Sequence, residues 1–466
     1  MFRKRWRKIL AASLVVGTLT FAPEIYDVKN FSVVHAEVKL YTAMGVDYGN
    51  ELESQDIVKL RARDKAIKNA VKQAGVYLKT YSRSVNSELT DDEITAITSN
   101  AYELVGEPKY NRVIKQVSDQ ITLIVWEVTV DVNVDDGEIT KWYNRDDKER
   151  STLISQTRET NEAAAENERK VEDLRKRANN ITDEAGRAQL KKEFEQADNE
   201  FLSNQKVEEG TRLAYNQKFD DAIKLYTEAI ELNPNNAAAY NWRGNIRNTR
   251  ALGKELVEKN LPAGKKLREQ ALDDLNRTIQ LKPDYSEAYG NRGFVYFSAK
   301  NYSNSIKDFN RAIELNPNHV QNYVYRALYW KQIAKDNNRA LADYNKALEL
   351  DPNNAHVYMN RATFYKFNMK NYSLAIEDLT KAIQFETQEF MIGYYYYVRG
   401  ECYQKLKLYD KAVADYTQAI PLIERDENFK KLVPFAYDER GKCYQALGDT
   451  AKAQADFKKA EEFGKR

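Results

Sequence analysis

Residues 286–317 read SEAYGNRGFVYFSAKNYSNSIKDFNRAIELNP, and this stretch decides the fold. Its first half predicts a helix with an aromatic, a small residue and a second aromatic on one face. Its second half predicts another helix, with a small residue, an aromatic and an alanine before a proline. In order, these positions are Tyr289, Gly293, Tyr296, Ser305, Phe309, Ala312 and Pro317. Small residues let two helices pack closely and proline ends the second one, so the stretch predicts a helical hairpin.

The hairpin recurs with a period of about 34 residues, which is typical of stacked helix pairs. The second helices carry Ala222-Tyr226-Ala229-Pro234, Ala271-Leu275-Thr278-Pro283, Ala340-Tyr344-Ala347-Pro352, Ala375-Leu379-Ala382, Ala412-Tyr416-Ala419 and Ala453-Phe457-Ala460. The first helices carry Tyr323-Ala327-Trp330, Tyr358-Ala362-Tyr365, Tyr396-Gly400-Tyr403 and Tyr437-Gly441-Tyr444. We therefore predict seven hairpins, near residues 203–236, 237–285, 286–319, 320–354, 355–392, 393–433 and 434–466.

This pattern resembles the tetratricopeptide repeat family over more than half of the chain. The resemblance implies an α-solenoid that binds protein and has first helices along its concave side. One hairpin departs from the pattern, because residues 248–270 contain an insertion of about fifteen residues relative to the repeat period. We expect the insertion to lengthen a helix or to form a protruding loop, broken at Leu261-Pro262-Ala263-Gly264.

Charged residues repeat with the same period. Arginine precedes the small residue of six first helices, and aspartate precedes the aromatic or leucine of six second helices. These are Arg243, Arg292, Arg326, Arg361, Arg399 and Arg440, and Asp274, Asp308, Asp343, Asp378, Asp415 and Asp456. We interpret them as a structural ladder of ion pairs within or between hairpins rather than as a ligand site.

The concave lining follows from the repeat register and is rich in apolar and aromatic residues. We predict a partner-binding groove made of Phe294, Phe297, Val324, Leu328, Met359, Lys366, Phe367, Tyr394 and Tyr397, with Lys331, Glu401 and Lys442 among them. Exposed aromatics are suited to anchor a bound peptide. Packing against neighbouring hairpins is the alternative role for the same side chains.

Some relatives grip the terminal carboxylate of chaperone tails with a fixed set of Lys, Asn and Arg. Here Asn245 and Asn291 match two of those positions, but Asn241, Gln321 and Tyr325 stand where cations are expected. The resemblance therefore does not extend to that chaperone role.

The region 37–136 predicts a small α+β domain. We predict strands at 38–45, 76–85, 113–117 and 121–134, a helix at 57–74 ended by Gly75, and a helix after a capping box at Thr90 and Glu93. The runs ARDKAIKNA and QAGV, followed by LTDDEI, resemble a family of envelope lipoproteins and flagellar-ring assembly proteins. This resemblance implies residence in the bacterial envelope and contact with protein, although the family's lipid-bearing cysteine is absent.

Residues 137–202 are rich in charged residues, glutamine and alanine, and predict a solvated helical hairpin as a spacer. Asn179 and Asn180 supply its turn and Thr182 caps its second arm. Its apolar residues are too sparse for a coiled-coil seam.

Residues 1–36 predict an export signal, with a basic start, an apolar run from Ile9 to Ala22 and a cleavage pattern at Val34-His35-Ala36. An uncleaved anchor is the alternative, although this run of fourteen residues falls short of the ~20 that span a bilayer. The 72 Lys and Arg against 70 Asp and Glu become 66 against 68 after cleavage. A net charge this small predicts no nucleic-acid partner.

The chain contains few residues of the types that form catalytic or metal-binding sites. It has three histidines and two cysteines, and Cys402 and Cys443 occupy equivalent positions in neighbouring repeats, where we expect two buried free thiols. No spaced metal site, phosphate loop or nucleophile elbow is present, so we predict no cofactor and no enzyme. The sequence favours an exported scaffold that binds a partner protein; a structural subunit of a surface or flagellar assembly and a cell-wall glycan-binding module are the alternatives.

Overall fold

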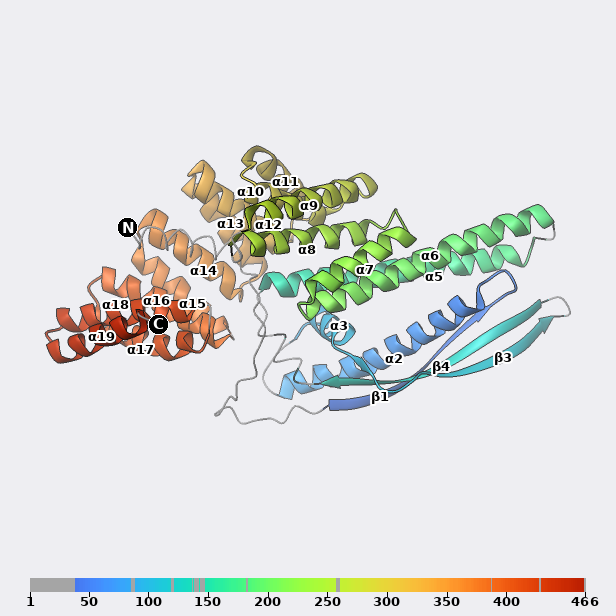
Figure 1. Ribbon diagram of the computed structural model, residues 1–466, viewed down its shortest axis with the longest axis horizontal. Coiled ribbons are helices and arrows are strands. Elements are labelled where there is room, and N and C mark those ends of the chain that lie inside the picture. The colour runs from blue at the N-terminus through green and yellow to red at the C-terminus, as the bar shows by residue number, and fades with distance from the viewer. Residues whose placement is uncertain are drawn as a thin grey trace. The chain divides into compact units, whose positions relative to one another are not determined.

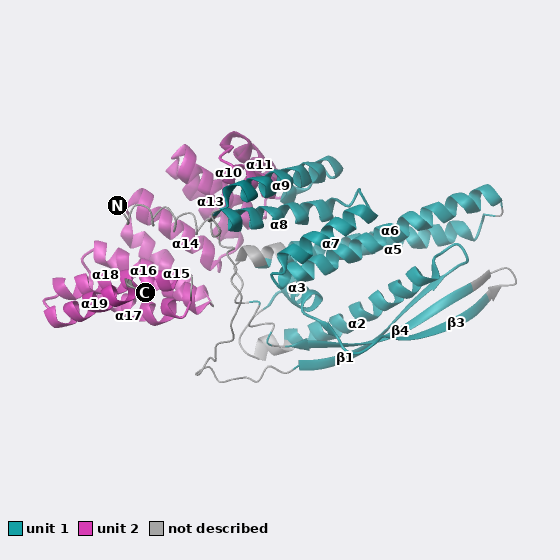
Figure 2. Cartoon of the chain, in the orientation of Figure 1, with its two compact units in different colours: residues 1–142, 148–288 teal, residues 143–147, 289–466 magenta. Residues whose placement is uncertain are grey.

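The computed structural model describes residues 38–84, 89–118, 121–135, 137, 142, 147–181, 183–256, 260–386, 388–426 and 429–464 (Figure 1). The expected signal segment, residues 1–36, lies outside these ranges. The chain divides into two compact units, residues 1–142 with 148–288 and residues 143–147 with 289–466 (Figure 2). The described part is mainly α-helical with one antiparallel sheet near its N-terminal end, as predicted.

The sheet of the first unit is built around one long strand. Its strands are β1 (Val38–Gly49), β2 (Glu103–Leu104), β3 (Lys109–Ser118) and β4 (Ile121–Asp135). β4 pairs antiparallel with all twelve residues of β1 and, on its other edge, with β2 and β3. Alternate residues of β4 are buried, including Val128, Val130, Val132 and Val134, as expected for a strand with one face against the core.

The helix α2 (Gln55–Ser84) covers the buried face of this sheet (Figure 1). Its buried residues recur every four positions, as Val58, Ala62, Ala66, Ala70, Ala74 and Leu78. A stripe of alanines on one helix face allows the helix axis to come close to the strands. Gly45 of β1 sits at the closest approach, where an added Cβ would lie 2.2 Å from the carbonyl oxygen of Ala62.

We expect Gly45→Ala to lower the free energy of unfolding of the first unit by about 1–3 kcal/mol, because the methyl group would press on the backbone of α2. Chemical denaturation followed by hydrogen exchange of α2 measures the loss. Met44→Ala is the matched control, since Met44 is the neighbouring residue on the exposed face of β1. An equal effect of both substitutions would contradict the close approach.

The predicted strand at 76–85 is wrong, because α2 does not end at Gly75 but continues to Ser84. Leu78 is fully buried and extends the four-residue stripe of the helix. Gly75 is used for packing rather than for termination: an added Cβ would lie 3.3 Å from Ile94 of α3 (Asp91–Asn100). The capping box at the start of α3 is confirmed, with Thr90 and Glu93 bonding to each other's backbone.

The expected spacer is a hairpin of α5 (Asp147–Ala178) and α6 (Glu184–Tyr215), with its turn at Asn179 and Asn180 as predicted. Thr182 lies outside the described residues, and the N-cap of α6 is Asp183. The hairpin is not solvated on all sides. Its facing sides form a core of Val171, Leu174, Leu190, Phe194 and Ala197.

The helix α6 continues past the expected boundary between residues 202 and 203 without a break. Its N-terminal part packs on α5, and its C-terminal part is the first helix of the first repeat hairpin, packed on α7 (Phe219–Leu232). The spacer and the repeat array therefore share one helix.

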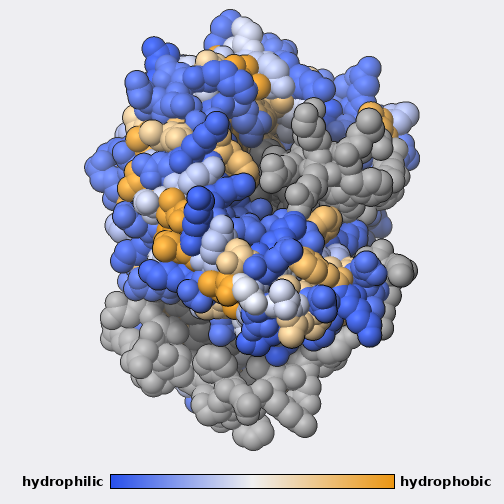
Figure 3. All heavy atoms as spheres, turned by 90° about the vertical axis from the view of Figure 1, so that its left-hand side faces the viewer, coloured by the Kyte–Doolittle hydropathy of each residue, from blue (hydrophilic) through white to orange (hydrophobic). Residues whose placement is uncertain are grey.

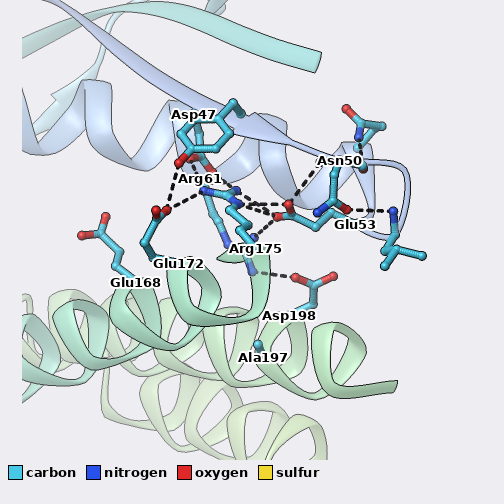
Figure 4. Close-up of polar contacts among 12 residues, drawn as sticks. Asp47, Asn50, Glu53, Arg61, Glu168, Glu172, Arg175, Ala197 and Asp198 are labelled. Atoms are coloured by element: carbon cyan, nitrogen blue, oxygen red, sulfur yellow. Dashed lines mark hydrogen bonds and ion pairs between the residues drawn. The ribbon is translucent and has the colours of Figure 1, made fainter. Parts of the chain in front are cut away.

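A cluster of buried charges joins the sheet and α2 to this hairpin (Figure 4). Arg175 of α5 reaches toward two carboxylates, and its guanidinium donates to Glu53 at 2.8 and 2.9 Å and to Asp47 at 3.3 Å. Arg61 of α2 donates to Glu53 at 3.2 Å and to Asp198 of α6 at 2.6 Å.

Lys65 completes the charge cluster, with its Nζ 3.1 Å from Asp47. Three cations thus face three buried carboxylates, and the more exposed Glu168 and Glu172 lie within 4.0 Å of Lys65 and Arg175. The side chain of Glu53 has no exposed surface. Burial raises the pKa of Asp198 to about 6, while the charge of Arg61 opposes the rise. A buried charge tolerates loss of its partner poorly, so this cluster fixes how the elements meet.

The described helices form the seven predicted hairpins. After α6 and α7 they are α8 (Ala237–Leu256) with α9 (Leu261–Leu281), α10 (Ser286–Ser298) with α11 (Tyr302–Leu315), α12 (Val320–Tyr329) with α13 (Asn337–Leu350), α14 (Ala355–Phe364) with α15 (Tyr372–Phe385), α16 (Glu389–Lys405) with α17 (Tyr409–Glu424), and α18 (Val433–Ala446) with α19 (Thr450–Gly464). The boundary between the two units falls within α10.

The inserted residues of the second hairpin lengthen both of its helices to 20 and 21 residues. Asn260 caps α9 and Pro262 lies in its first turn, so the predicted break is the start of a helix. Of the two alternatives, the structure therefore supports the longer helix.

Two neighbouring hairpins each contain a π-helical turn at the end of the first helix, Trp330–Ala334 after α12 and Tyr365–Met369 after α14. These first helices span 15 residues where α10 spans 13. A π turn absorbs extra residues without breaking the helix, and such turns are frequent at functional sites.

The long helix α5 also contacts the second hairpin within the first unit. Trp242 Nε1 donates to Glu159 Oε2 at 2.9 Å, and the Tyr285 hydroxyl bonds to the same carboxyl group. Burial raises the pKa of Glu159 to about 8, against the effect of these hydrogen bonds. The carboxyl group therefore holds a proton more tightly in the folded protein than in the unfolded chain.

We expect the stability of the first unit to fall as the pH rises from about 5 to 8, by at most ~1.4 kcal/mol per pH unit for this one proton. The sign follows because the folded state binds the proton that the unfolded state releases. Glu159→Gln stays neutral and should flatten the profile. Urea unfolding at several pH values measures the free energy of unfolding of the original protein and of Glu159→Gln. If this free energy depended on pH in the same way in both proteins, the raised pKa would not belong to Glu159.

Candidate functional site

The predicted charge ladder is present, and each pair joins the two helices of one hairpin. In every pair the guanidinium makes two parallel bonds to the carboxylate, with N···O distances from 2.6 to 3.0 Å. The pairs are Arg243–Asp274, Arg292–Asp308, Arg326–Asp343, Arg361–Asp378, Arg399–Asp415 and Arg440–Asp456.

Most ladder arginines also bond to the preceding hairpin. Their third nitrogen donates to a polar residue on that hairpin's second helix, as in Arg361 to Asn345 at 2.7 Å. The others are Arg243 to Thr227, Arg326 to Asn310, Arg399 to Thr380 and Arg440 to Thr417. The ladder thus connects helices within and between hairpins, and its donors are occupied. It is a structural feature, as interpreted from the sequence.

The predicted groove is not an open apolar surface. Phe294, Phe297, Val324, Leu328, Met359, Lys366 and Tyr394 are buried, Tyr397 is half-buried, and only Phe367 is exposed, at 55%. These seven side chains are therefore largely covered by neighbouring protein atoms, and their role in partner binding stays a prediction.

The physical reason is aromatic packing between neighbouring elements. Phe294 stacks on Tyr325 of the next hairpin, with ring centroids 4.7 Å apart. Tyr394 lies 5.4 Å from the ring of Phe429, and Tyr397 lies 5.8 Å from Tyr416. Packing against neighbouring hairpins is the alternative role that the sequence analysis gave for these side chains.

A polar strip remains on the first helices of three successive hairpins, made of Lys331, Thr363, Lys366 and Glu401 beside the exposed Phe367. Lys331 Nζ lies 3.4 Å from Thr363 Oγ1 of the next hairpin, and Lys366 makes an ion pair with Glu401 of the hairpin after that. Lys366 Nζ is also 4.8 Å from the ring centre of Phe367. Both lysines lie in the π-helical turns.

The two lysines of the polar strip differ in their partners. Lys366 is paired with a carboxylate, whereas Lys331 forms no ion pair with any residue in the described ranges. Burial alone lowers the pKa of Lys331 to about 8, with no carboxylate raising it. Lys331 nevertheless keeps part of its surface open to solvent.

The sequence included Lys331 in the lining but did not single it out, and it missed Thr363. The signal lies in the repeat register. Lys331 and Lys366 occupy equivalent positions of neighbouring repeats, as do Thr363 and Glu401. At these equivalent positions, Lys366 faces the carboxylate of Glu401 and Lys331 faces the hydroxyl of Thr363.

The two cysteines do not add a reactive group. Cys402 and Cys443 are buried and free, and burial raises the pKa of each thiol to about 11. A thiol with a raised pKa is a poor nucleophile at neutral pH. Within the described ranges there is no group of three or more His, Cys, Asp or Glu that could hold a metal ion.

The face drawn in Figure 3 carries hydrophobic residues only in small groups, separated by hydrophilic ones. Exposed apolar residues of the second unit include Phe367, Met369, Leu406, Leu408 and Leu447. No helix among the described residues is both long enough and apolar enough to cross a membrane.

Antiparallel hairpins that stack in register define an α-solenoid protein. Residues 286–319, 343–384, 393–425 and 436–463 match the tetratricopeptide repeat, and residues 210–247 match a TPR repeat. These five segments of the chain are therefore similar to tetratricopeptide repeats.

Known proteins resemble parts of the chain. Hsp70-Hsp90 organizing protein 3 of Arabidopsis thaliana is 30% identical over 120 residues, which are 25% of this chain and 19% of that protein. Hsp70-Hsp90 organizing protein of Triticum aestivum is 26% identical over 227 residues, 47% of this chain and 35% of that protein. The chain thus spans about a fifth to a third of these relatives' length. A solved tetratricopeptide repeat protein from Parabacteroides merdae is 21% identical, covers 57% of this chain and 99% of its own, and has a TM-score of 0.37.

Proposed function

We propose that this protein is an exported, non-enzymatic scaffold whose repeat array binds a partner protein or peptide through its first helices. The observation that carries the proposal is the polar strip, which runs over three stacked hairpins beside the exposed ring of Phe367. A row of spaced polar groups on a rigid solenoid matches the repeating polar groups of an extended peptide. Protein binding by tetratricopeptide arrays supports the same conclusion.

The partner is not expected to be a chaperone tail, although the relatives are named as Hsp70-Hsp90 organizing proteins. Asn241 is buried and bonds to the hydroxyl of Tyr285 at 3.3 Å. Tyr325 is buried against the rings of Phe294 and Phe309. Neither position offers the cation that such a tail requires.

Two other functions compete with the scaffold. A cell-wall glycan-binding module needs exposed aromatic faces on which sugars stack, and most aromatics of the predicted groove are buried. A structural subunit of a surface or flagellar assembly fits the N-terminal resemblance equally well. It differs in requiring permanent incorporation into a larger complex.

Export and envelope contact belong to the proposal as well. The basic and apolar layout of residues 1–36 supports export, and the resemblance of residues 37–136 to an envelope domain supports docking there. Mass spectrometry of the N-terminus of the protein made in cells tests this. We expect a mature chain that begins at Glu37 in the envelope or culture fraction; an intact Met1 in the cytoplasm would overturn export.

A photo-crosslinking amino acid at position 367 tests partner binding in the full chain. We expect it to capture one recurrent protein from envelope extracts. The same group at Glu377, an exposed residue on the second helix of the same hairpin, is the matched control and should capture little. Equal capture from both positions would argue against binding through the first helices. Retention by wall polysaccharide alone would favour the glycan module, and stoichiometric co-purification with an assembly would favour the structural subunit.

A further inference from the structure

Lys331 has no carboxylate partner among the described residues, whereas Lys366, the equivalent lysine of the next hairpin, has one. In the next hairpin, Lys366 occupies the same repeat position and pairs with the carboxylate of Glu401. At the position equivalent to Glu401, the residue that faces Lys331 is Thr363, and its hydroxyl lies 3.4 Å away. A hydroxyl solvates an ammonium ion but leaves its charge uncompensated.

The hydroxyl of Thr363 is already engaged, since it donates to the backbone oxygen of Asn360 at 2.8 Å. No carboxylate of the described residues approaches Lys331, and burial is the only influence on its pKa, which is lowered to about 8. A protein that places an ammonium ion in such surroundings loses stability unless another group offsets the cost. A bound carboxylate would supply the missing charge.

The surroundings of Lys331 also suit a ligand site geometrically. The side chain of Lys331 is partly buried but keeps some exposure to solvent, so a ligand can reach it. Lys331 lies in the π-helical turn Trp330–Ala334. The ion pair of Lys366 and the exposed ring of Phe367 lie one hairpin further along, within reach of an extended peptide.

We propose that Lys331 binds a carboxylate of the partner peptide between the fourth and fifth hairpins, in the place that Glu401 fills for Lys366. This assignment rests on the proposed function, since it names the chemistry of the segment that the array binds. The bound segment carries an acidic side chain or a free C-terminus. This site differs from the chaperone-tail clamp, whose cationic positions hold Asn241, Gln321 and Tyr325.

The test follows the Lys331 signal by NMR in the full chain after ¹³C-methylation of its lysines. The signal is assigned by its loss in Lys331→Arg. Three probes are used: acetyl-Gly-Gly-Asp-Gly-Gly-amide, its Asn counterpart, and acetyl-pentaglycine with a free C-terminus. We expect an acidic probe to raise the midpoint of Lys331 by about one pKa unit or more, because an opposite charge now lies beside it. The Asn peptide should leave it unchanged, and Lys366 should not respond, because it is already paired.

Thr363→Glu supplies the carboxylate from within the chain, as Glu401 does. We expect this variant to raise the midpoint of Lys331 without any probe and to lose the response to the acidic probes, whereas Thr363→Gln should do neither. A matching response to the Asp and Asn peptides, or none to either acidic probe, would overturn the carboxylate site. Capture by the crosslinker at position 367 would then still stand, so failure of this inference is distinguishable from failure of the scaffold proposal. The Lys366 signal reports whether the array remains folded in the variants.

Discussion

Replacement of Arg175 by methionine is expected to lower the free energy of unfolding of the first unit by about 3–5 kcal/mol, the usual cost of removing one partner of a buried ion pair. Two carboxylates, Asp47 and Glu53, share this guanidinium and have almost no exposed surface. Their negative charges would then face only Arg61 and Lys65.

Hydrogen exchange of α2 and β4 in increasing urea measures this loss where it occurs, because both elements meet the charge cluster. The matched control is Arg177→Met, two residues along α5. Arg177 pairs with Glu193 at 2.6 Å, but its side chain is 45% exposed, so its loss should cost far less than that of Arg175. Equal destabilisation by the two substitutions would show that the buried cluster does not hold the unit together.

The second large effect is expected in the repeat array. Arg361→Met should destabilise the fifth hairpin by about 3 kcal/mol, since Asp378 would remain buried without its guanidinium. Burial already raises the pKa of Asp378, and Arg361 opposes that rise. Without the arginine, the carboxyl group should take up a proton more readily. The destabilisation should therefore be smaller at about pH 5 than at pH 8, because protonation removes the uncompensated charge.

Thermal unfolding at the two pH values, together with hydrogen exchange of α14 and α15, tests this expectation. The double variant Arg361→Met with Asp378→Leu removes both charges and should recover more than half of the loss. Arg311→Met is the control, because its pair with Glu314 is exposed on both sides. A double variant as unstable as the single one would mean that packing, not charge, is the ladder's contribution.

The repeat array was predictable because every feature of its hairpins occurs several times in the sequence. Small residues at helix crossings and the Arg–Asp pairs stand out by their period, and the ladder followed from that period alone. The exposure of an individual aromatic did not follow. Phe294 is covered by Tyr325 from the next hairpin, and the repeat register does not specify how neighbouring rings meet.

The N-terminal domain has no internal repeat, so its elements can be predicted only from local sequence. The strands β1, β3 and β4 and the capping box at Thr90 were predicted from local pattern. The short strand β2 was not predicted, and neither was the length of α2, because Gly75 reads locally as a helix end. The charge cluster was missed for another reason. Asp47 and Asp198 are far apart in the sequence, and only the fold brings Asp47 to Arg175 and Asp198 to Arg61, the two arginines that share Glu53.

The unbroken helix α6 has a mechanical consequence. At ~1.5 Å per residue, its 32 residues form a rod about 48 Å long that belongs to the spacer at one end and to the first repeat at the other. A flexible linker would let the first hairpin move independently of the charge cluster, but here one continuous helix connects the two. A partner that pulls on the first hairpin would therefore transmit force along α6 to the charge cluster and the sheet.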